Sequence, residues 1–289
     1  MRHVRTLRDL RSKGIAIVVK ANRLVSVAAP AIGVLAVFML AVFMLGFASR
    51  AQAQEATESR QAAHPTDVAV VEGAFLPQTL SARVGSTQGF ALGSAGFDSA
   101  RSGPLIDSAV EVLVWGPFAL RVQATYSNDT KKMRPSIGGR AQLLRQEQHG
   151  IDGAITVFYR TEGFTEAEGE IETFASVGRR FESFSAVGNL VYGQDADGNE
   201  RDGEIRAAVW HQGRRLALGL DTRARFAIGT QHGRAATSEP SFDFFAGPIA
   251  TVLAGPVALF AESGPSVFRL AGGPTRAGAV ALAGVGAAF

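Results

Sequence analysis

Apolar and polar residues alternate along the stretch from Arg215 to Ile228. Its even positions are mostly apolar, whereas its odd positions include Asp221, Arg223 and Arg225. Side chains alternate between the two faces of a β-strand, so the pattern predicts one apolar face and one charged face. The stretch exceeds the ~5–6 residues usual in a soluble sheet and suffices for a tilted strand across a bilayer, which needs ~9–11. The pattern therefore favours a transmembrane β-barrel, with lipid outside and charges facing a lumen.

The same period of two recurs from Leu80 to the end of the chain. It predicts ten to twelve strands, with twelve the best count, and no long segment after residue 54 shows a helical period. Short and long connections alternate, and the last long one is expected over Ser263–Thr275. Short turns on one rim and longer loops on the other are typical of an outer-membrane barrel. We expect an all-β, antiparallel up-and-down barrel over residues 80–289, with both termini periplasmic.

The first 53 residues differ from the rest. An uncharged run between Arg23 and Arg50 follows a basic segment and precedes Ala51-Gln52-Ala53. This order predicts a signal peptide over residues 1–53, cleaved before Gln54. An uncleaved helical anchor is the alternative, because the run is long enough to span a bilayer. Residues 54–79 are polar and predict a flexible periplasmic tail.

The net charge of +3 comes from this leader. The leader holds eight of the 29 basic residues and one of the 26 acidic residues, so the remainder has 21 basic and 25 acidic residues and a net charge of −4. A nucleic-acid partner therefore loses the support of a basic pI. The chain has no Cys, which excludes disulfides, thiol catalysis and cysteine metal sites.

Aromatic residues gather near the predicted strand ends. Amphipathic rings at both membrane interfaces form the aromatic girdles of a barrel. The alternative is that aromatic residues simply favour strands. The expected interface residues are Trp115, Phe118, Tyr126, Tyr159, Phe184, Tyr192 and Trp210.

Residues 80–289 resemble Gram-negative outer-membrane β-barrel proteins as a class. Such proteins usually end in an aromatic residue with apolar residues at alternate positions before it, and Phe289, Ala287, Val285 and Ala283 fit this frame. The chain departs from the class at Ala287, where a second aromatic residue is common. The resemblance implies an outer-membrane location in a Gram-negative bacterium, the lipid bilayer as surroundings, and Phe289 as the signal read by the barrel assembly machinery.

The face opposite the lipid is expected to hold six acids and seven bases. They are Glu111, Arg121, Arg140, Asp152, Arg160, Glu170, Glu172, Glu204, Arg206, Arg215, Asp221, Arg223 and Arg225. These charges predict either a salt-bridged filling or a narrow hydrophilic channel for small solutes. Barrels of eight strands are filled and those of sixteen leave a channel, so a count of twelve does not decide.

A positive patch is expected in the upper lumen at Arg223 and Arg225. The preceding strand is expected to be too short to place an acid opposite them. Neutralisation is therefore expected to be partial and to come from a loop with Asp195, Asp197 and Asp202. An open lumen would then favour anions weakly.

The acidic loop also has the spacing of a weak candidate metal site. Oxygen ligands alternate at Asp195, Asp197, Asn199 and Asp202, as in a calcium loop. However, Glu200 and Arg206 stand where an EF-hand has Gly and Glu, so an acidic hairpin loop is favoured. No cofactor is expected.

A catalytic histidine would need a serine nucleophile close to it. His149, His211 and His232 have no Ser at matching parity beside them, so no nucleophile–base pair can be drawn. The sequence therefore predicts a non-enzymatic outer-membrane barrel, either a narrow passive channel or a structural barrel. A lipid-modifying enzyme and a soluble periplasmic β-protein are the alternatives.

Overall fold

The structure is a computed structural model of the chain. It describes residues 72–288, with gaps at 75, 78, 94–95, 99–103, 129–130, 162, 164–168, 197–200, 229–239 and 271–272. The described residues belong to one compact unit, Gln61–Phe289. The predicted signal peptide, its cleavage point before Gln54 and Phe289 lie outside the described residues. No helix among the described residues is long and apolar enough to cross a membrane.

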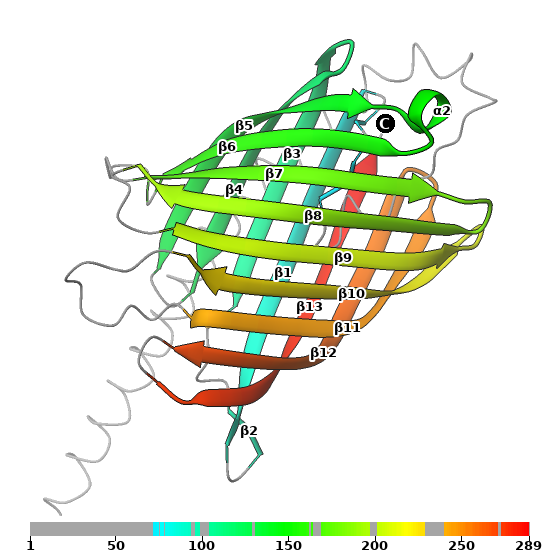
Figure 1. The fold of residues 1–289 in the computed structure, drawn as a ribbon. Helices are drawn as coiled ribbons and strands as arrows, with labels where there is room; N and C mark the ends of the chain where they lie inside the picture. The colour runs from blue at the N-terminus through cyan, green and yellow to red at the C-terminus, as the bar shows by residue number, and fades with distance from the viewer. Residues whose placement is uncertain are drawn as a thin grey trace, which may run out of the picture. The chain divides into compact units, whose positions relative to one another are not determined.

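The described fold consists of β-strands and one short helix, α2 (Gln146–His149) (Figure 1). The strands are β1 (Leu80–Gly93), β2 (Gly96–Asp98), β3 (Leu105–Trp115), β4 (Phe118–Ser127), β5 (Lys132–Leu144), β6 (Asp152–Thr161), β7 (Gly169–Arg180), β8 (Phe184–Asp195), β9 (Arg201–Gln212), β10 (Leu216–Ala227), β11 (Pro240–Ala254), β12 (Val257–Leu270) and β13 (Thr275–Ala288).

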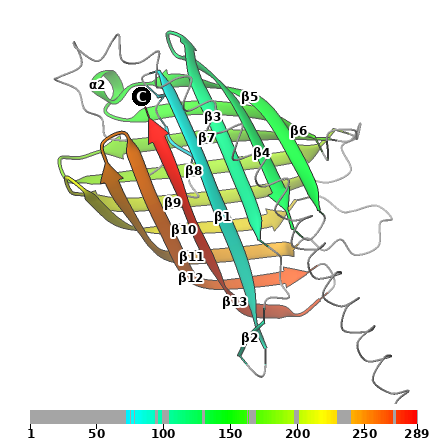
Figure 2. The same ribbon diagram turned by 180° about the vertical axis from the view of Figure 1, so that it is seen from behind.

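The strands form one antiparallel sheet that closes on itself. Each strand pairs with the next along the chain, except that the short β2 folds back onto β1. The seam pairs β1 with β13 from Ser81↔Ala288 to Ala91↔Gly278, and both strands lie side by side in Figure 2. Apart from β2, the closed barrel has twelve strands, which confirms the predicted count and fold class. Closure gives each of the twelve barrel strands a partner on both sides, so none of these twelve is an edge strand.

One predicted connection was wrong. Gly264 and Pro265 signal a loop, but β12 continues to Leu270 and Pro265 pairs with Ala279 of β13. Residues 265–269 alternate between exposed and buried as the rest of the strand does: Ser266 and Phe268 are buried, while Val267 is exposed. The loop before β13 therefore shortens to residues 271–274.

The outer surface of the barrel is an apolar belt. In β10, Leu216, Leu218 and Leu220 are 45, 53 and 61% exposed, whereas Ala217 and Asp221 are 2% exposed. This confirms the predicted parity of the strand. Large aliphatic side chains are exposed in the same way on other strands, at Val122, Ile137, Val157, Ile171, Val177, Leu190, Ile205, Val252 and Leu259. Soluble monomers rarely expose so large an apolar surface, so this belt argues against the alternative of a soluble periplasmic protein.

Most of the predicted interface aromatic residues lie on this outer surface. Trp115 is 73% exposed and stacks on Phe118 across the turn at Gly116 and Pro117, with ring centroids 6.1 Å apart. Tyr159, Phe184 and Tyr192 are also exposed. Exposure is what an interface position requires, and contact of these rings with headgroups stays a prediction.

Trp210 and Tyr126 do not behave as predicted. Trp210 is 2% exposed because it lies on the inward face of β9, and it packs over Gly219 of β10. A Cβ on Gly219 would lie 2.5 Å from the Trp210 Cβ, so this site needs glycine. Tyr126 is 9% exposed and is buried despite its place at a strand end. The interface assignment is wrong for both.

Candidate functional site in the barrel lumen

The inward face of the barrel holds the predicted charges, and most of them are paired. Glu111, Arg121, Arg140, Asp152 and Asp221 are each at most 4% exposed. Buried charges are costly unless they are paired and hydrogen-bonded. The pairs fall into separate clusters along the wall.

The first cluster lies against strands β1, β3, β4 and β5, and we call it the Glu72 cluster. Its members are Glu72, Arg83, Glu111, Arg121 and Arg140. The Arg121 and Arg140 guanidiniums both donate to Oε1 of Glu72, and Arg83 Nη2 lies 4.0 Å from Oε2. Glu111 shares the same bases, with Oε1 3.3 Å from Arg140 Nε and Oε2 3.9 Å from Arg121 Nη1. Three guanidiniums therefore enclose two carboxylates.

Glu72 was not predicted as a lumen residue. It lies before β1, in the segment predicted to be a flexible tail, yet it is 3% exposed, and Ala74 beyond it is fully buried. The flexible-tail prediction is therefore wrong for the described end of that segment. Its sequence signal was weak: a single acid between an apolar run and Gly73.

A side chain of β8 holds the backbone of Glu72. The N–H of Glu72 donates to Asn189 Oδ1 at 2.7 Å, and Asn189 Nδ2 donates to the Glu72 carbonyl at 2.8 Å. Asn189 Nδ2 also donates to Ser176 Oγ at 2.9 Å. The segment thus bridges the lumen, with its carboxylate toward β4 and β5 and its backbone on β8.

The electrostatics of Glu72 favour its charged form. Burial alone would raise the pKa of the Glu72 carboxyl, but the Arg121, Arg140, Arg83 and Arg206 guanidiniums lower it to about 2. Arg side chains stay protonated in proteins, so the attraction persists over the whole accessible pH range. Glu72 is therefore a fixed negative charge at neutral pH.

The remaining clusters lie toward the rims and on the opposite wall. Arg160 contacts Glu170 and Glu172, with Nη2 2.6 Å from Glu172 Oε2. At the short-turn end, Arg180 Nη2 lies 3.1 Å from Asp152 Oδ2.

Arg223 and Arg225 do not form the expected positive patch. Arg223 lies 3.3 Å from Glu204 and 3.1 Å from Asp243, and Arg225 Nε donates to Asp202 Oδ2 at 2.6 Å. The expected pairing with Asp202 is confirmed at Arg225. The expected positive patch was wrong because β9 begins at Arg201, so it is long enough to place Glu204 beside Arg223, and because β11 adds Asp243. Glu204 also accepts from Arg206 at 2.8 Å.

Arg215 was also predicted to face the lumen. It lies instead in the turn before β10, where it is exposed. The alternating pattern of β10 ends at Leu216, so parity does not extend to Arg215. The other predicted lumen charges lie inward.

Aromatic side chains share the interior with the charges, although only charged residues were predicted to face the lumen. Phe158 and Phe174 pack edge to face at 5.8 Å. Arg121 lies over the Phe158 ring at 5.4 Å and Arg206 lies over the Phe174 ring at 5.2 Å. These cation–π contacts hold the guanidiniums against the wall. The parity of Asp152 and Arg160 in β6 would have placed Phe158 inside.

The candidate calcium residues give no metal site in the described part of the chain. Asp197 and Asn199 lie outside the described residues, and Asp202 is paired with Arg225. The described residues contain no group of three or more His, Cys, Asp or Glu that could hold a metal ion.

The histidines contact groups other than a nucleophile. His149 Nδ1 in α2 lies 3.2 Å from the carbonyl oxygen of Arg145, and the His211 ring packs against Phe184 with centroids 5.0 Å apart. Both are exposed near the short turns. His232 lies outside the described residues.

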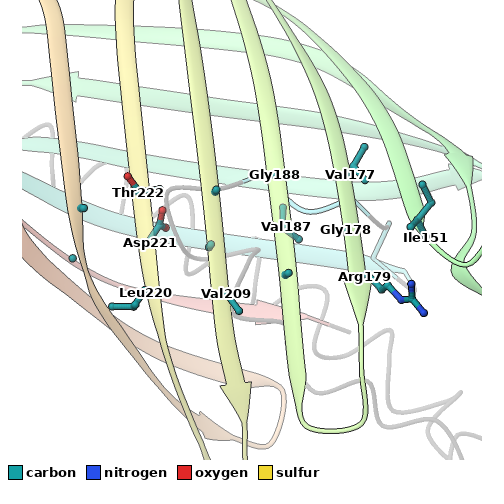
Figure 3. A pocket seen from close by; sticks show the side chains of 15 residues that line it. Ile151, Val177, Gly178, Arg179, Val187, Gly188, Val209, Leu220, Asp221 and Thr222 are labelled. Atoms are coloured by element: carbon teal, nitrogen blue, oxygen red, sulfur yellow. The ribbon is translucent and has the colours of Figure 1, made fainter.

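A hollow of about 670 Å³ lies over β7–β11 (Figure 3). Its lining includes Val177, Val209 and Leu220, which are 51, 45 and 61% exposed and belong to the outward-facing set. The hollow therefore opens on the apolar outer surface. In the lumen, the space beside Glu72 and Arg83 is about 10 Å³, room for about one water.

No protein-family model and no curated protein matches the sequence. Among solved structures, the chain is similar to the NanC porin (8% identity, TM-score 0.48, covering 73% of this chain and 100% of that one). It is similar to the KdgM porin (6%, 0.47, 72% and 99%) and to the outer membrane channel DcaP of Acinetobacter baumannii (9%, 0.41, 73% and 96%). These three structures are described as porins or as an outer membrane channel. Identities of 6–9% say nothing about function.

Proposed function

We propose that this protein is an outer-membrane β-barrel that acts as a narrow passive channel for small polar solutes. The observation behind the proposal is the division of the wall into two chemistries. Leu218 and Val122 represent an apolar belt that suits lipid, while Arg140 and Asp221 represent a charged lining. A barrel that served only as a scaffold could be filled with apolar side chains at lower electrostatic cost. The lipid bilayer and the barrel assembly machinery are its expected partners.

The proposed channel is narrow because large side chains occupy much of the interior. Phe158, Phe174 and Phe245 are at most 5% exposed on the inward face. The Glu72 segment crosses between β5 and β8 at the same wall. Such a lumen suits ions and small solutes rather than polymers.

The absence of Cys in the chain allows a direct test by cysteine modification. Ser136 faces inward from β5 and is 5% exposed, whereas Ala207 faces outward from β9. We would record Ser136→Cys and the control Ala207→Cys in planar bilayers before and after a cationic methanethiosulfonate reagent.

Reaction at Ser136→Cys should reduce the current by at least half, because the added group occupies a narrow water path. Ala207→Cys should keep its current. Absence of any current in the unmodified proteins would instead favour a filled structural barrel. An equal loss of current in both variants would show that the current does not pass through the lumen.

A further inference from the structure

The Glu72 cluster has the composition of a carboxylate-binding site. Its bases come from three strands of the wall, Arg83 from β1, Arg121 from β4 and Arg140 from β5. The carboxylate of Glu72 accepts from two of them and lies 4.0 Å from the third. Guanidinium forks match carboxylate oxygens in shape and charge, so this arrangement selects carboxylates over neutral groups.

The bound carboxylate and its three bases differ in how they are anchored. The bases sit on strands that are paired on both sides within a closed barrel, so they cannot leave. Glu72 comes from the segment before β1, and Asn189 holds its backbone through two hydrogen bonds. The carboxylate can therefore leave without breaking any strand pairing.

Departure of Glu72 would leave a positive site. Arg83, Arg121 and Arg140 would then face Glu111 as the acid within the cluster. Guanidiniums do not lose their protons, so the departure of Glu72 removes one negative charge from beside them, and an anion from solution can replace it. With Glu72 in place, the neighbouring space of about 10 Å³ admits no solute larger than water. A solute must therefore displace Glu72 and cannot bind beside it.

We propose that Arg83, Arg121 and Arg140 form a binding site for small organic carboxylates in the lumen, and that Glu72 fills this site in cis. Glu72 is then a displaceable plug, and a carboxylate-bearing solute competes with its side chain. The inference names the solute class of the proposed channel. The claim that such solutes pass through the barrel rests on the proposed channel function, whereas the claim that they bind at the three arginines does not.

Competition with Glu72 should lower the apparent affinity of the wild-type protein for a free carboxylate. A ligand for a site that is mostly occupied has an apparent affinity reduced by the fraction of open site. Removal of the Glu72 carboxylate should therefore raise the apparent affinity for a free carboxylate. Loss of one of the arginines should abolish the gain.

The test uses the purified full chain in detergent, with isothermal titration calorimetry at fixed ionic strength. The probes are succinate and its neutral diamide, succinamide, which have the same carbon skeleton. Glu72→Ala should bind succinate at least tenfold more tightly than the wild type and should show no gain for succinamide. Glu72→Ala/Arg121→Gln should lose the gain. Glu147→Ala is the matched control, because Glu147 is an exposed carboxylate that pairs with Arg180 at the rim.

Asn189→Ala keeps every charge and removes the two hydrogen bonds to the Glu72 backbone. It should raise succinate affinity by a smaller factor, and it decides the case if Glu72→Ala does not fold. A folded Glu72→Ala or Asn189→Ala without a gain for succinate would overturn the proposal, as would an equal gain for succinamide. Binding in detergent does not require conductance, so a gain in a protein that passes no current would refute the channel and support the site.

Discussion

A single arginine on the lipid-facing side of β4 should destabilise the barrel far more than its neighbour in sequence. Val122 is 51% exposed at the middle of β4, and its register partners are Ile137 and Val110. An Arg in that apolar row near the bilayer midplane costs ~2–4 kcal/mol. At ~1.4 kcal/mol per factor of ten, Val122→Arg should raise the equilibrium constant for unfolding by roughly 30- to 700-fold. Gln123→Arg faces the lumen beside Ser136 and should cost about 1 kcal/mol or less.

The measurement is a guanidinium unfolding titration in phospholipid vesicles. Trp115 is exposed on the outer surface and Trp210 is buried inside, so fluorescence reports on both environments. Equal costs for Val122→Arg and Gln123→Arg would refute the assignment of outward and inward faces. A larger cost for Gln123→Arg would place the lipid on the other face.

Three further predictions follow from particular residues. Deletion of Phe289 should lower the amount of protein in the outer-membrane fraction on immunoblots, and unchanged amounts would count against the assembly signal. The pKa of Glu72 falls from 4.5 to about 2, so the stability that its charge contributes is complete above pH 4.5 and is lost as the pH falls toward 2. The charges that face Glu72 are Arg83, Arg121, Arg140, Arg206 and Glu111. Acid unfolding of the wild type should therefore be steeper than that of Glu72→Gln across this window, and identical curves would contradict the prediction. In the proposed channel, Arg223→Ser with Arg225→Ser should shift the reversal potential toward cations, because two positive charges beside Glu204, Asp243 and Asp202 are removed. An unchanged potential would show that these groups lie off the ion path.

The sequence predicted the barrel because a membrane-spanning strand must show its pattern locally. Leu218 and Asp221 reveal the two faces within a few residues, and the alternation repeats in every strand. The number of strands followed from counting these segments. Strand ends were less well predicted, because Gly264 and Pro265 resemble a turn in sequence but lie within β12.

The lumen contacts could not be predicted, because they depend on register between strands and on distant segments. Glu72 and Arg140 are 68 residues apart, and no local pattern links them. Trp210 shares the parity of Glu204 and Arg206 in β9, so period two places it inside, whereas its contact with Gly219 depends on the register with β10. Period two also places Phe158 inside, on the face whose charged residues were predicted to face the lumen.

The pairing of charges in the lumen changes what the barrel can select. A free pair of arginines would repel cations along the whole upper path, but Arg223 and Arg225 each lie against an acid within about 3 Å. Such pairs leave small local fields, and an ion passing them feels dipoles rather than a net charge. The Glu72 cluster differs, since one of the two carboxylates that offset its three arginines comes from a residue outside the barrel wall. A solute that displaces Glu72 would face the positive field of three guanidiniums in that cluster. Selectivity for anions would therefore arise at the Glu72 cluster and not at Arg223 and Arg225.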